Sequence, residues 1–541
     1  MPVQVSYPGV YVEEIPSGVH TITGVATSIC AFVGTAPRGP ANVATEVFSF
    51  AEYEQVFGGL TLDGAGQPFA LGFAVRDFFL NGGSDAIVVR VDGSGSKLAS
   101  VTLGGVLTLS AASGGTWGNN LWARADTLQT RDPANPALFN LVVQEYVDGQ
   151  ALKLERYLNL STNPTDPTFV VGYLAANSSL VTASKVTGNF AANKQFPDPP
   201  APPAPGSPPA PAAKPTDGFS AFAGGVDGKP AATDVIGDAD AKTGLHALDG
   251  VDIFNLLSLP PIAPVADVHA LEPIATAAAA YCQSRRALYI VDPPDTWIND
   301  WSGKGGPSAG LNTIAGDLTT LRGGASSNAA IFFPRLVEAN PLHKYQLETF
   351  AASGAIAGIF ARTDVARGVW KAPAGLEAVF TGVQQLSLAL TNAENGKLNE
   401  IGVNCLRTFP IVGNVVWGAR TLNGADVLES DFKYVPVRRF QLFLEESLYR
   451  GTQWVVFEPN DEPLWSQIRL NVGAFMHDLF RQGAFQGATP QKAYFVQCDS
   501  QTTTQTDIDK GIVNILVGFA PLKPAEFVIL KIQQMAGQIA V

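Results

Sequence analysis

One five-residue pattern in this chain has the spacing of a catalytic nucleophile. Residues 306–310 read GPSAG and fit G-x-S-x-G, in which a serine occupies a sharp turn between a buried strand and a helix. The preceding residues, 301–305 (WSGKG), form a polar segment rather than a buried strand. A hydrolytic triad also needs a later carboxylate and a histidine, and nothing marks His343 or His477 for that role. We therefore predict no catalytic residue.

Patterns for binding metals or cofactors are also missing from the sequence. The five histidines form no i, i+4 pair and none lies near a cysteine, which argues against a metal site. There is no Walker A sequence and no G-x-G-x-x-G after a strand, so we predict no nucleotide cofactor. The cysteines are scattered, and most lie in apolar runs typical of small buried side chains in a reducing compartment; they are Cys30, Cys282, Cys405 and Cys498.

The composition is that of a large chain with little charge. Only 15% of the residues are charged, against about 25% in an average soluble protein. Two interpretations stay open: much of the surface faces other subunits, or the genome is rich in Gly, Ala and Pro codons. The net charge of −13 argues against nucleic acid as a partner. We expect no secretory signal and, without an uninterrupted apolar run of membrane length, no membrane insertion.

The first half of the chain divides into four segments by pattern. Residues 1–20 alternate like an extended strand without a local partner, and we assign them as an N-terminal arm. Residues 21–92 read as α/β, with strands at 29–33 and 86–91 and helices at 50–57 and 68–81. Short alternating segments over 93–190 predict an all-β insertion. Residues 191–232, with ten prolines between Pro197 and Pro215, predict an exposed loop that is either a linker or a displayed ligand segment.

The second half alternates between strand and helix signals. Within 233–400, strands at 251–257, 287–291 and 329–333 alternate with helices at 266–284 and 347–363, which predicts a mostly parallel sheet with helices on its faces. Within 401–520 we predict helices over 438–450 and 460–482 and a strand over 512–519. A last strand at 527–532 lies in a C-terminal arm, 521–541. The pair Arg438–Arg439 reads as a salt-bridging surface or interface pair, with an anion site as the alternative.

Several ordered stretches resemble contractile tail sheath proteins of phages and of extracellular contractile injection systems. The stretches are 8–14 (PGVYVEE), 361–364 (ARTD), 367–374 (RGVWKAPA), 416–422 (VWGARTL), 434–439 (YVPVRR), 451–460 (GTQWVVFEPN) and 524–527 (PAEF). Residues 93–230 match weakly, as a variable outer insertion would. At 351–354 (AASG) the family often has two prolines before Ser-Gly, and we expect a local loop change there.

The resemblance implies a fold and a mechanical function. It implies a multidomain α/β protein whose middle domain has a subtilisin-like topology without the catalytic residues. Such subunits polymerise helically around an inner tube and contract to drive it through an envelope, together with baseplate and terminator or cap proteins. Terminal arms of neighbouring subunits add strands to the C-terminal domain of a third subunit. The implied setting is assembly in the bacterial cytoplasm, as part of a phage virion tail or of an extracellular or cytoplasmic injection particle.

The resemblance also points to the residues that would link the subunits. We assign the N-terminal arm contacts to Tyr7, Val10, Tyr11 and Val12. We assign the C-terminal arm contacts to Phe527, Val528, Ile529, Leu530 and Ile532. The polar face of the 462–482 helix is the candidate for inner-tube contact, through Arg469, Asp478 and Arg481. Two alternatives stay open: a non-contractile subunit of a capsid-like particle or surface layer, and a hydrolase that uses Ser308.

Overall fold

The computed structural model describes residues 20–147, 150–191, 219–262 and 265–531, and its centre is an eight-stranded sheet. All neighbours from β17 to β3 pair in parallel, while β18 and β2 run antiparallel at the two edges. The mostly parallel sheet expected from the sequence is thus confirmed. The strand order is β18 (Gly413–Val416), β17 (Asn404–Phe409), β13 (Ala329–Phe333), β12 (Leu288–Val291), β11 (Leu256–Ser258), β1 (Cys30–Gly34), β3 (Ala86–Arg90) and β2 (Thr45–Val47).

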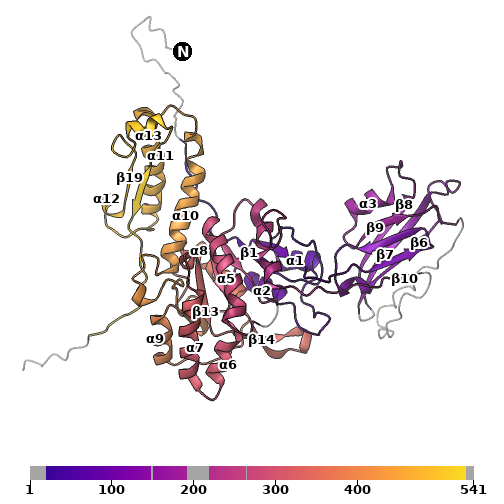
Figure 1. Ribbon diagram of the computed structural model, residues 1–541, viewed down its shortest axis with the longest axis horizontal. Helices are drawn as coiled ribbons and strands as arrows, with labels where there is room; N and C mark the ends of the chain where they lie inside the picture. Colours follow the sequence, from indigo (N-terminus) through magenta and orange to yellow (C-terminus); the bar gives the residue numbers. More distant parts are fainter. Residues whose placement is uncertain (1–19, 148–149, 192–218, 263–264, 532–541) are drawn as a thin grey trace, which may run out of the picture.

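Helices cover both faces of this sheet because its strands are apolar on both sides. Alternate residues of a strand point to opposite faces: Ala31 and Val33 join the core beside α5 (Val268–Ser284) and α7 (Gly306–Leu321), whereas Cys30 and Phe32 join the core beside α2 (Ala70–Leu80) and α8 (Ser353–Arg367). All four cysteines are buried with free thiols, including the one that does not lie in an apolar run. The unit, central in Figure 1, also contains α1 (Phe50–Phe57), α4 (Ala232–Ile236), α6 (Asp295–Ser302) and α9 (Asn392–Glu400).

Three of the predicted segments contribute strands to this one sheet. β1, β2 and β3 come from 21–92, β11 to β13 come from 233–400, and β17 and β18 come from the segment assigned to 401–520. β17 continues the sheet in parallel from β13, with Phe333 opposite Cys405. The boundary that we predicted at residue 400 therefore falls inside the sheet. In the sequence alone, the β17–β18 hairpin has the pattern of a new unit, because its partner β13 lies far away along the chain.

The helix predicted over 347–363 begins too early. Its first residues form a strand, β15 (Gln346–Phe350), which pairs with β14 (Leu336–Asn340); β14 also pairs with β16 (Gln385–Leu386). Helix α8 begins only at Ser353, where a carboxylate oxygen of Asp292 accepts hydrogen bonds from the backbone N–H groups of Ala352 and Ser353 at 2.9 and 3.0 Å. These contacts from a distant strand end satisfy the open N–H groups of the helix start, which local periodicity could not reveal.

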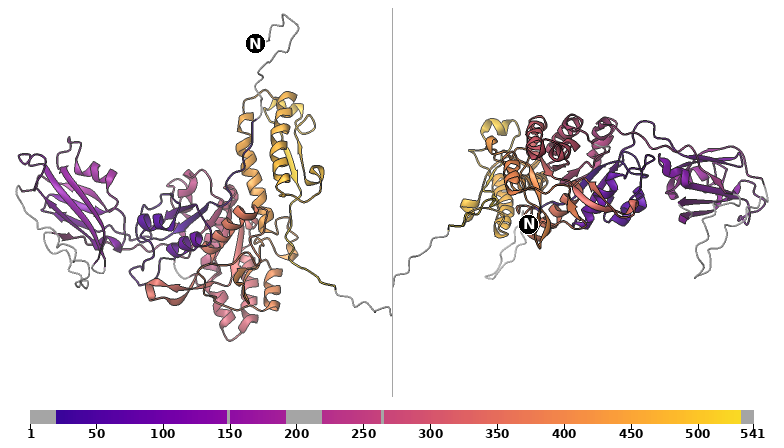
Figure 2. Two further views of the ribbon diagram at one scale, coloured as in Figure 1. Left: turned by 180° about the vertical axis from the view of Figure 1, so that it is seen from behind. Right: turned by 90° about the horizontal axis from the view of Figure 1, so that it is seen from below.

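A β-rich unit lies at one end of the elongated molecule, apart from the central sheet (Figures 1 and 2). Its two sheets enclose a core of their own. It also contains α3 (Val170–Asn177), packed beside β9, so the expectation of an all-β insertion is wrong at this helix. One sheet has the order β4 (Ser100–Leu103), β5 (Leu107–Ala111) and β9 (Val181–Val186); the other has the order β10 (Ser220–Ala221), β6 (Leu121–Asp126), β7 (Leu138–Val147) and β8 (Gln150–Ser161).

The β-rich unit is completed by residues that follow the proline-rich segment. β10 pairs antiparallel with β6, and single bridges join Ser100 to Ala223 and Lys97 to Val226. The chain therefore still belongs to this unit after residue 218, before it goes back to the central sheet at β11. The end of the insertion that we predicted at residue 190 lies before these last contacts.

The C-terminal unit is built around two long helices. α10 (Val435–Gly451) starts earlier than predicted because Pro436 fits the first helical turn. α11 (Glu462–Arg481) begins where the side chain of Asp461 accepts a hydrogen bond from the backbone N–H of Leu464. Their apolar sides share one core. The remaining elements are α12 (Pro490–Ala493), β19 (Tyr494–Gln497), α13 (Gln505–Asp509) and β20 (Leu516–Phe519).

A buried ion pair joins this unit to the central sheet. The guanidinium of Arg439 in α10 donates to both carboxylate oxygens of Asp364 in α8 at 2.8 and 2.6 Å, and to the carbonyl oxygen of Thr27 at 2.8 Å. The Arg439 and Asp364 side chains are 3% and 2% exposed. Arg438 is also buried and donates to the side-chain oxygen of Asn328. Arg439 forms a salt bridge, as predicted for this pair, but the surface position is wrong for both arginines because both are buried at the junction.

A second buried charge cluster lies between α2 and β14, and it carries a pH prediction. Arg76 contacts both Asp77 and Glu338, whose carboxyl groups are almost fully buried. Burial raises the pKa of both carboxyls above their ordinary values, against the opposing effect of Arg76. The folded chain therefore holds protons that the unfolded chain has released above about pH 4.3, and the stability they contribute falls as the pH rises through the raised pKa values.

We expect Glu338→Gln to remove most of the fall in stability that accompanies rising pH. Between pH 5 and pH 8 the free energy of unfolding of the wild type should fall by about 1–3 kcal/mol relative to that of the variant. Urea unfolding at several pH values measures the difference. Parallel curves for the two proteins would contradict the assignment.

Candidate functional site

The G-x-S-x-G pattern does not form a nucleophile elbow. Residues 306–310 are the first turn of α7, and the element before them is the helix α6, not a strand. The side chain of Ser308 is exposed at this turn. Because a nucleophile elbow needs a strand directly before the serine, the structure offers Ser308 no such position.

We predict that Ser308→Ala changes nothing measurable. The free energy of unfolding should stay within about 0.5 kcal/mol of wild type, as for an ordinary surface position. A fluorophosphonate probe should label neither protein. Labelling that disappears in Ser308→Ala would restore the hydrolase alternative.

Two other kinds of site are missing from the described part of the chain. No group of three or more His, Cys, Asp or Glu side chains within it could hold a metal ion. Among the same residues, no helix combines the length and apolarity needed to cross a membrane. The remaining candidate sites are surfaces that could bind other chains.

The C-terminal arm exposes a continuous run of apolar side chains. After β20, residues 522–531 form neither helix nor strand and lead away from the body of the molecule (Figure 1). Phe527, Val528, Ile529 and Leu530 are 76%, 80%, 80% and 81% exposed. An extended run of this kind leaves a contiguous apolar surface in water, which soluble proteins rarely keep uncovered. These predicted arm residues are therefore available for contact with another chain; Ile532 lies outside the described residues.

The C-terminal unit also offers strands that could accept a partner. β19 and β20 form an antiparallel pair, with Tyr494 opposite Phe519 and Gln497 opposite Leu516. Within the described residues neither strand pairs with a third strand, so both outer edges of the pair lack a neighbour. Phe495 and Leu516 are 52% and 50% exposed. Since two-stranded sheets are marginal alone, added strands would stabilise this one.

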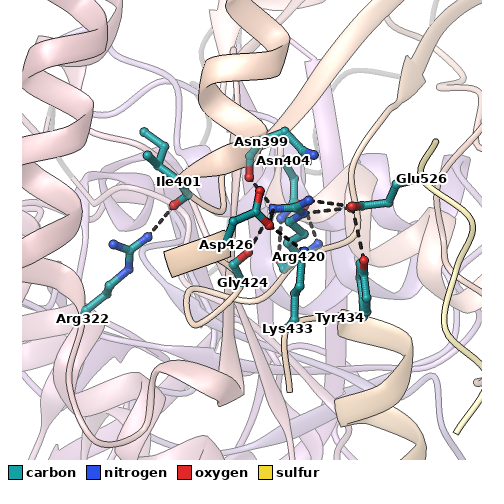
Figure 3. Close-up of polar contacts among 10 residues, drawn as sticks. All are labelled: Arg322, Asn399, Ile401, Asn404, Arg420, Gly424, Asp426, Lys433, Tyr434 and Glu526. Atoms are coloured by element: carbon teal, nitrogen blue, oxygen red, sulfur yellow. Dashed lines mark hydrogen bonds and ion pairs between the residues drawn. The ribbon is translucent and has the colours of Figure 1, made fainter. Parts of the chain in front are cut away.

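A buried arginine anchors the start of the C-terminal arm (Figure 3). The guanidinium of Arg420 donates two hydrogen bonds to the two carboxylate oxygens of Glu526, at 2.8 and 2.5 Å. Arg420 is 0% exposed and Glu526 16% exposed. The hydroxyl of Tyr434 donates to the same carboxylate at 3.3 Å. Such bidentate pairs between an arginine and a carboxylate are strong, and they fix the relative orientation of the two side chains.

The same guanidinium is held from the other side by the body of the protein. It donates to the carbonyl oxygens of Asn399 and Gly424 at 2.7 and 3.1 Å and to the carboxylate of Asp426 at 3.0 Å. Burial acts to lower the pKa of Arg420, but the hydrogen bonds and charge of Glu526 and the charge of Asp426 raise it overall. The guanidinium therefore stays charged and is surrounded by acceptors.

The candidate inner-tube residues do not share one face of α11. At 100° per residue, the nine positions between Arg469 and Asp478 turn the helix by about 900°, which places them on opposite sides. Arg469 contacts the carboxylate of Glu462, at the start of the same helix, and the carbonyl oxygen of Cys498, directly after β19. Asp478 and Arg481 are exposed near the other end of the helix. Only these two remain candidates for a common contact surface.

The two arms join the body at different places. The predicted N-terminal arm residues Tyr7, Val10, Tyr11 and Val12 lie outside the described residues. The described chain begins at His20. Its ring stacks on the ring of Trp454, which lies just beyond the end of α10, with 4.2 Å between the ring centroids. The anchor of the C-terminal arm contacts Tyr434, directly before α10 begins. The two attachment points are thus separated by the length of α10, about 25 Å.

Two sequence models of one family match the chain in the regions just described. The phage tail sheath protein central domain matches residues 234–422, and the phage tail sheath C-terminal domain matches residues 429–535. The chain belongs to the phage tail sheath family. The boundary between the two matches lies near the Arg420 anchor, and the arm as far as residue 535 falls inside the C-terminal match.

Curated tail sheath proteins match over different lengths. The tail sheath protein of Burkholderia phage BcepMu is 26% identical over 503 residues, which cover 90% of this chain and 88% of that protein. Those of Vibrio phage KVP40 and Enterobacteria phage T4 are 26% and 27% identical over 35% and 31% of this chain. The matched regions span only 28% and 26% of the latter two proteins.

Solved sheath structures share the fold of this tail sheath chain. The contracted sheath complex of the extracellular contractile injection system PVC superposes with a TM-score of 0.57 at 20% identity, covering 98% of this chain and 99% of that one. The contracted helical sheath of the anti-feeding prophage gives 0.55 at 23% identity, with the same coverage. A sheath tail protein of Desulfitobacterium hafniense gives 0.56 at 15% identity, covering 95% and 100%. At these identities the likeness shows the fold alone.

Proposed function

We propose that this chain is the subunit of a contractile sheath, which polymerises helically around an inner tube and shortens to drive that tube through a target envelope. The observation that carries the proposal is the exposed apolar arm, Phe527 to Leu530, which is anchored to the body through Glu526. The same chain contains a two-stranded sheet, β19 and β20, that has no third strand among the described residues. Membership of the tail sheath family supports the same function.

The arms link subunits by adding strands. The C-terminal arm of one subunit and the N-terminal arm of another extend β19 and β20 of a third, so that backbone hydrogen bonds give strength and side-chain pockets give register. The separation of the two attachment points along α10 lets one subunit reach two different neighbours. The rigid units can then slide past one another while the strands keep them connected.

Contraction needs no cofactor at the moment of firing. The extended polymer is metastable, and contraction buries more surface between subunits than extension does. A gain of a few kcal/mol per subunit, about the value of burying one or two large apolar side chains, adds up over a long polymer. The partners are other copies of this chain, the inner tube protein, and baseplate and terminator or cap proteins.

The finer architecture follows the same proposal. The central sheet unit corresponds to a subtilisin-like sheath domain without catalytic residues, so the chain is not an enzyme. The β-rich unit is an outer insertion, and the proline-rich segment is an exposed loop. The particle assembles in the bacterial cytoplasm as a phage tail or an injection particle, without contacts to nucleic acid and without insertion into a membrane. A non-contractile capsid-like or surface-layer subunit is disfavoured by the sheath family match.

Negative-stain electron microscopy of the purified chain tests the proposal. The intact chain should form hollow tubes, and a chain without residues 1–16 should form none. Tubes from both proteins would retain the sheath and discard the role of the N-terminal arm. Shells or flat lattices would favour the non-contractile alternative.

Deletion of residues 194–218 should leave assembly intact. Ten prolines and the surrounding small residues give this segment no means to build a packed interface. Electron microscopy of the deletion variant should show tubes as long and as numerous as those of the intact chain. Failure to polymerise would assign the segment a role in subunit contact.

A further inference from the structure

The C-terminal arm changes from attached to free at one residue. Glu526 is 16% exposed and holds its carboxylate against Arg420, whereas the next four side chains, from Phe527 to Leu530, are all at least 76% exposed. No strand or helix occurs among residues 522–531 that could hold this part of the chain in place. The side chain of Glu526 thus fixes the position and direction in which the arm leaves the body of the protein.

Arg420 belongs to the central sheet rather than to the C-terminal unit. The side chain of Asn404 in β17 accepts a hydrogen bond from the backbone N–H of Arg420 at 2.6 Å and donates one to its carbonyl oxygen at 2.7 Å. The same amide group donates to the carbonyl oxygen of Ile331 in β13 at 3.0 Å. The backbone of Arg420 is therefore bound directly to Asn404 of β17, and the same side chain links it to β13 in the interior of the molecule.

We propose that Arg420 is the positioning residue of the C-terminal arm, and that tension on the arm passes through Glu526 and Arg420 into the central sheet. In sequence the arm follows β20, so without this contact a pull on the arm would act on the small sheet of β19 and β20. The contact moves the attachment to β17 and β13. The β19–β20 pair can then accept strands from neighbours without being pulled apart by its own arm.

The consequence for the polymer rests on the proposed sheath function, but the positioning itself does not. Arg420 also contacts Asp426, which is 46% exposed and does not belong to the arm. Neutralising either carboxylate removes one negative charge from beside the same buried guanidinium. Only loss of Glu526 should free the arm, so Asp426→Asn is a matched control for Glu526→Gln.

Spin-label distances in the isolated subunit test the positioning. Val365 in α8 and Val528 in the arm are 84% and 80% exposed, and all native cysteines are buried, so nitroxide labels will attach to Val365→Cys and Val528→Cys. Glu526→Gln should widen the distribution of label-to-label distances at least twofold. Asp426→Asn should leave the width unchanged. Glu526→Asp, which keeps the charge but shortens the side chain, serves if Glu526→Gln fails to fold.

Tube formation by the unlabelled proteins tests the transfer of tension. Glu526→Gln should reduce the pelleted polymer about tenfold or yield only short fragments, whereas Asp426→Asn should assemble like wild type. An unchanged distance width in Glu526→Gln, or equal widening in Asp426→Asn, overturns the positioning role. If Glu526→Gln widens the distance distribution but still forms normal tubes, the proposal that tension passes through Glu526 and Arg420 is overturned. If the wild-type chain forms no tubes, the proposed function fails, and the distances still decide the positioning role.

Discussion

Replacing Val528 and Leu530 together by aspartate should abolish polymerisation while leaving the subunit folded. Both side chains are at least 80% exposed in the single chain, so the substitutions remove no contact within it. If the arm adds a strand to a neighbour, alternate residues face the same side. Burying two such apolar side chains contributes about 3–6 kcal/mol for each contact between subunits. We expect the critical concentration for tube formation to rise at least 100-fold, measured by sedimentation over a range of concentrations.

A matched control is available in the β-rich unit. Leu152 and Leu154 of β8 are 63% and 59% exposed and also lie on one face of a strand. Leu152→Asp with Leu154→Asp adds the same charge at exposed apolar positions outside the proposed arm. This variant should assemble like wild type. Thermal unfolding of all three proteins should agree within a few degrees; normal tubes from the arm variant would remove the C-terminal arm from the linkage.

Local pattern was sufficient where an element carries its own start signal and a regular apolar face. The helix predicted over 460–482 occurs as α11, because Asp461 and Pro463 mark its start and the apolar side chains from Leu464 to Leu479 recur at helical spacing. Short apolar runs likewise identified the buried strands β3 and β13. In these segments local propensity and tertiary burial favour the same structure.

Prediction failed where distant residues decide the structure. The helix predicted over 347–363 wrongly included β15, and the start of α8 depends on Asp292, which lies in another part of the sequence. The placement of β17 beside β13 could not be predicted either, since strand order depends on contacts across the whole domain.

The arm was predicted from its apolar residues, but its anchor was not. Arg420 and Glu526 are separated by 106 positions, and no spacing rule pairs them. A signal was nevertheless present, because the two residues lie in two of the stretches, 416–422 and 524–527, on which the family resemblance rested. An arginine and a glutamate in such stretches are of opposite charge, and their pairing is a hypothesis that the sequence alone could have supplied.

The largest loss of stability should follow Arg439→Ala, at the junction between the C-terminal unit and the central sheet. The variant leaves the carboxylate of Asp364 buried without its guanidinium partner, and removes the hydrogen bond to the carbonyl oxygen of Thr27. Breaking a buried pair from one side costs about 3–5 kcal/mol. Denaturant unfolding monitored by tryptophan fluorescence measures the change, and Trp370, Trp454 and Trp465 report on the C-terminal unit.

An exposed ion pair between Arg367, the last residue of α8, and Glu377 provides the control for the buried pair. Arg367 and Glu377 are 52% and 70% exposed, so Arg367→Ala should cost less than about 1 kcal/mol. Replacing both buried partners, as in Arg439→Met with Asp364→Leu, should recover most of the lost stability. The single change is costly largely because it leaves a buried charge without a partner. If the double variant is as unstable as Arg439→Ala, the junction depends on the hydrogen bond from Arg439 to the carbonyl oxygen of Thr27 rather than on charge balance. The buried pair would then act by holding the N-terminal segment against α8 and α10, where the chain enters the fold from the N-terminal arm.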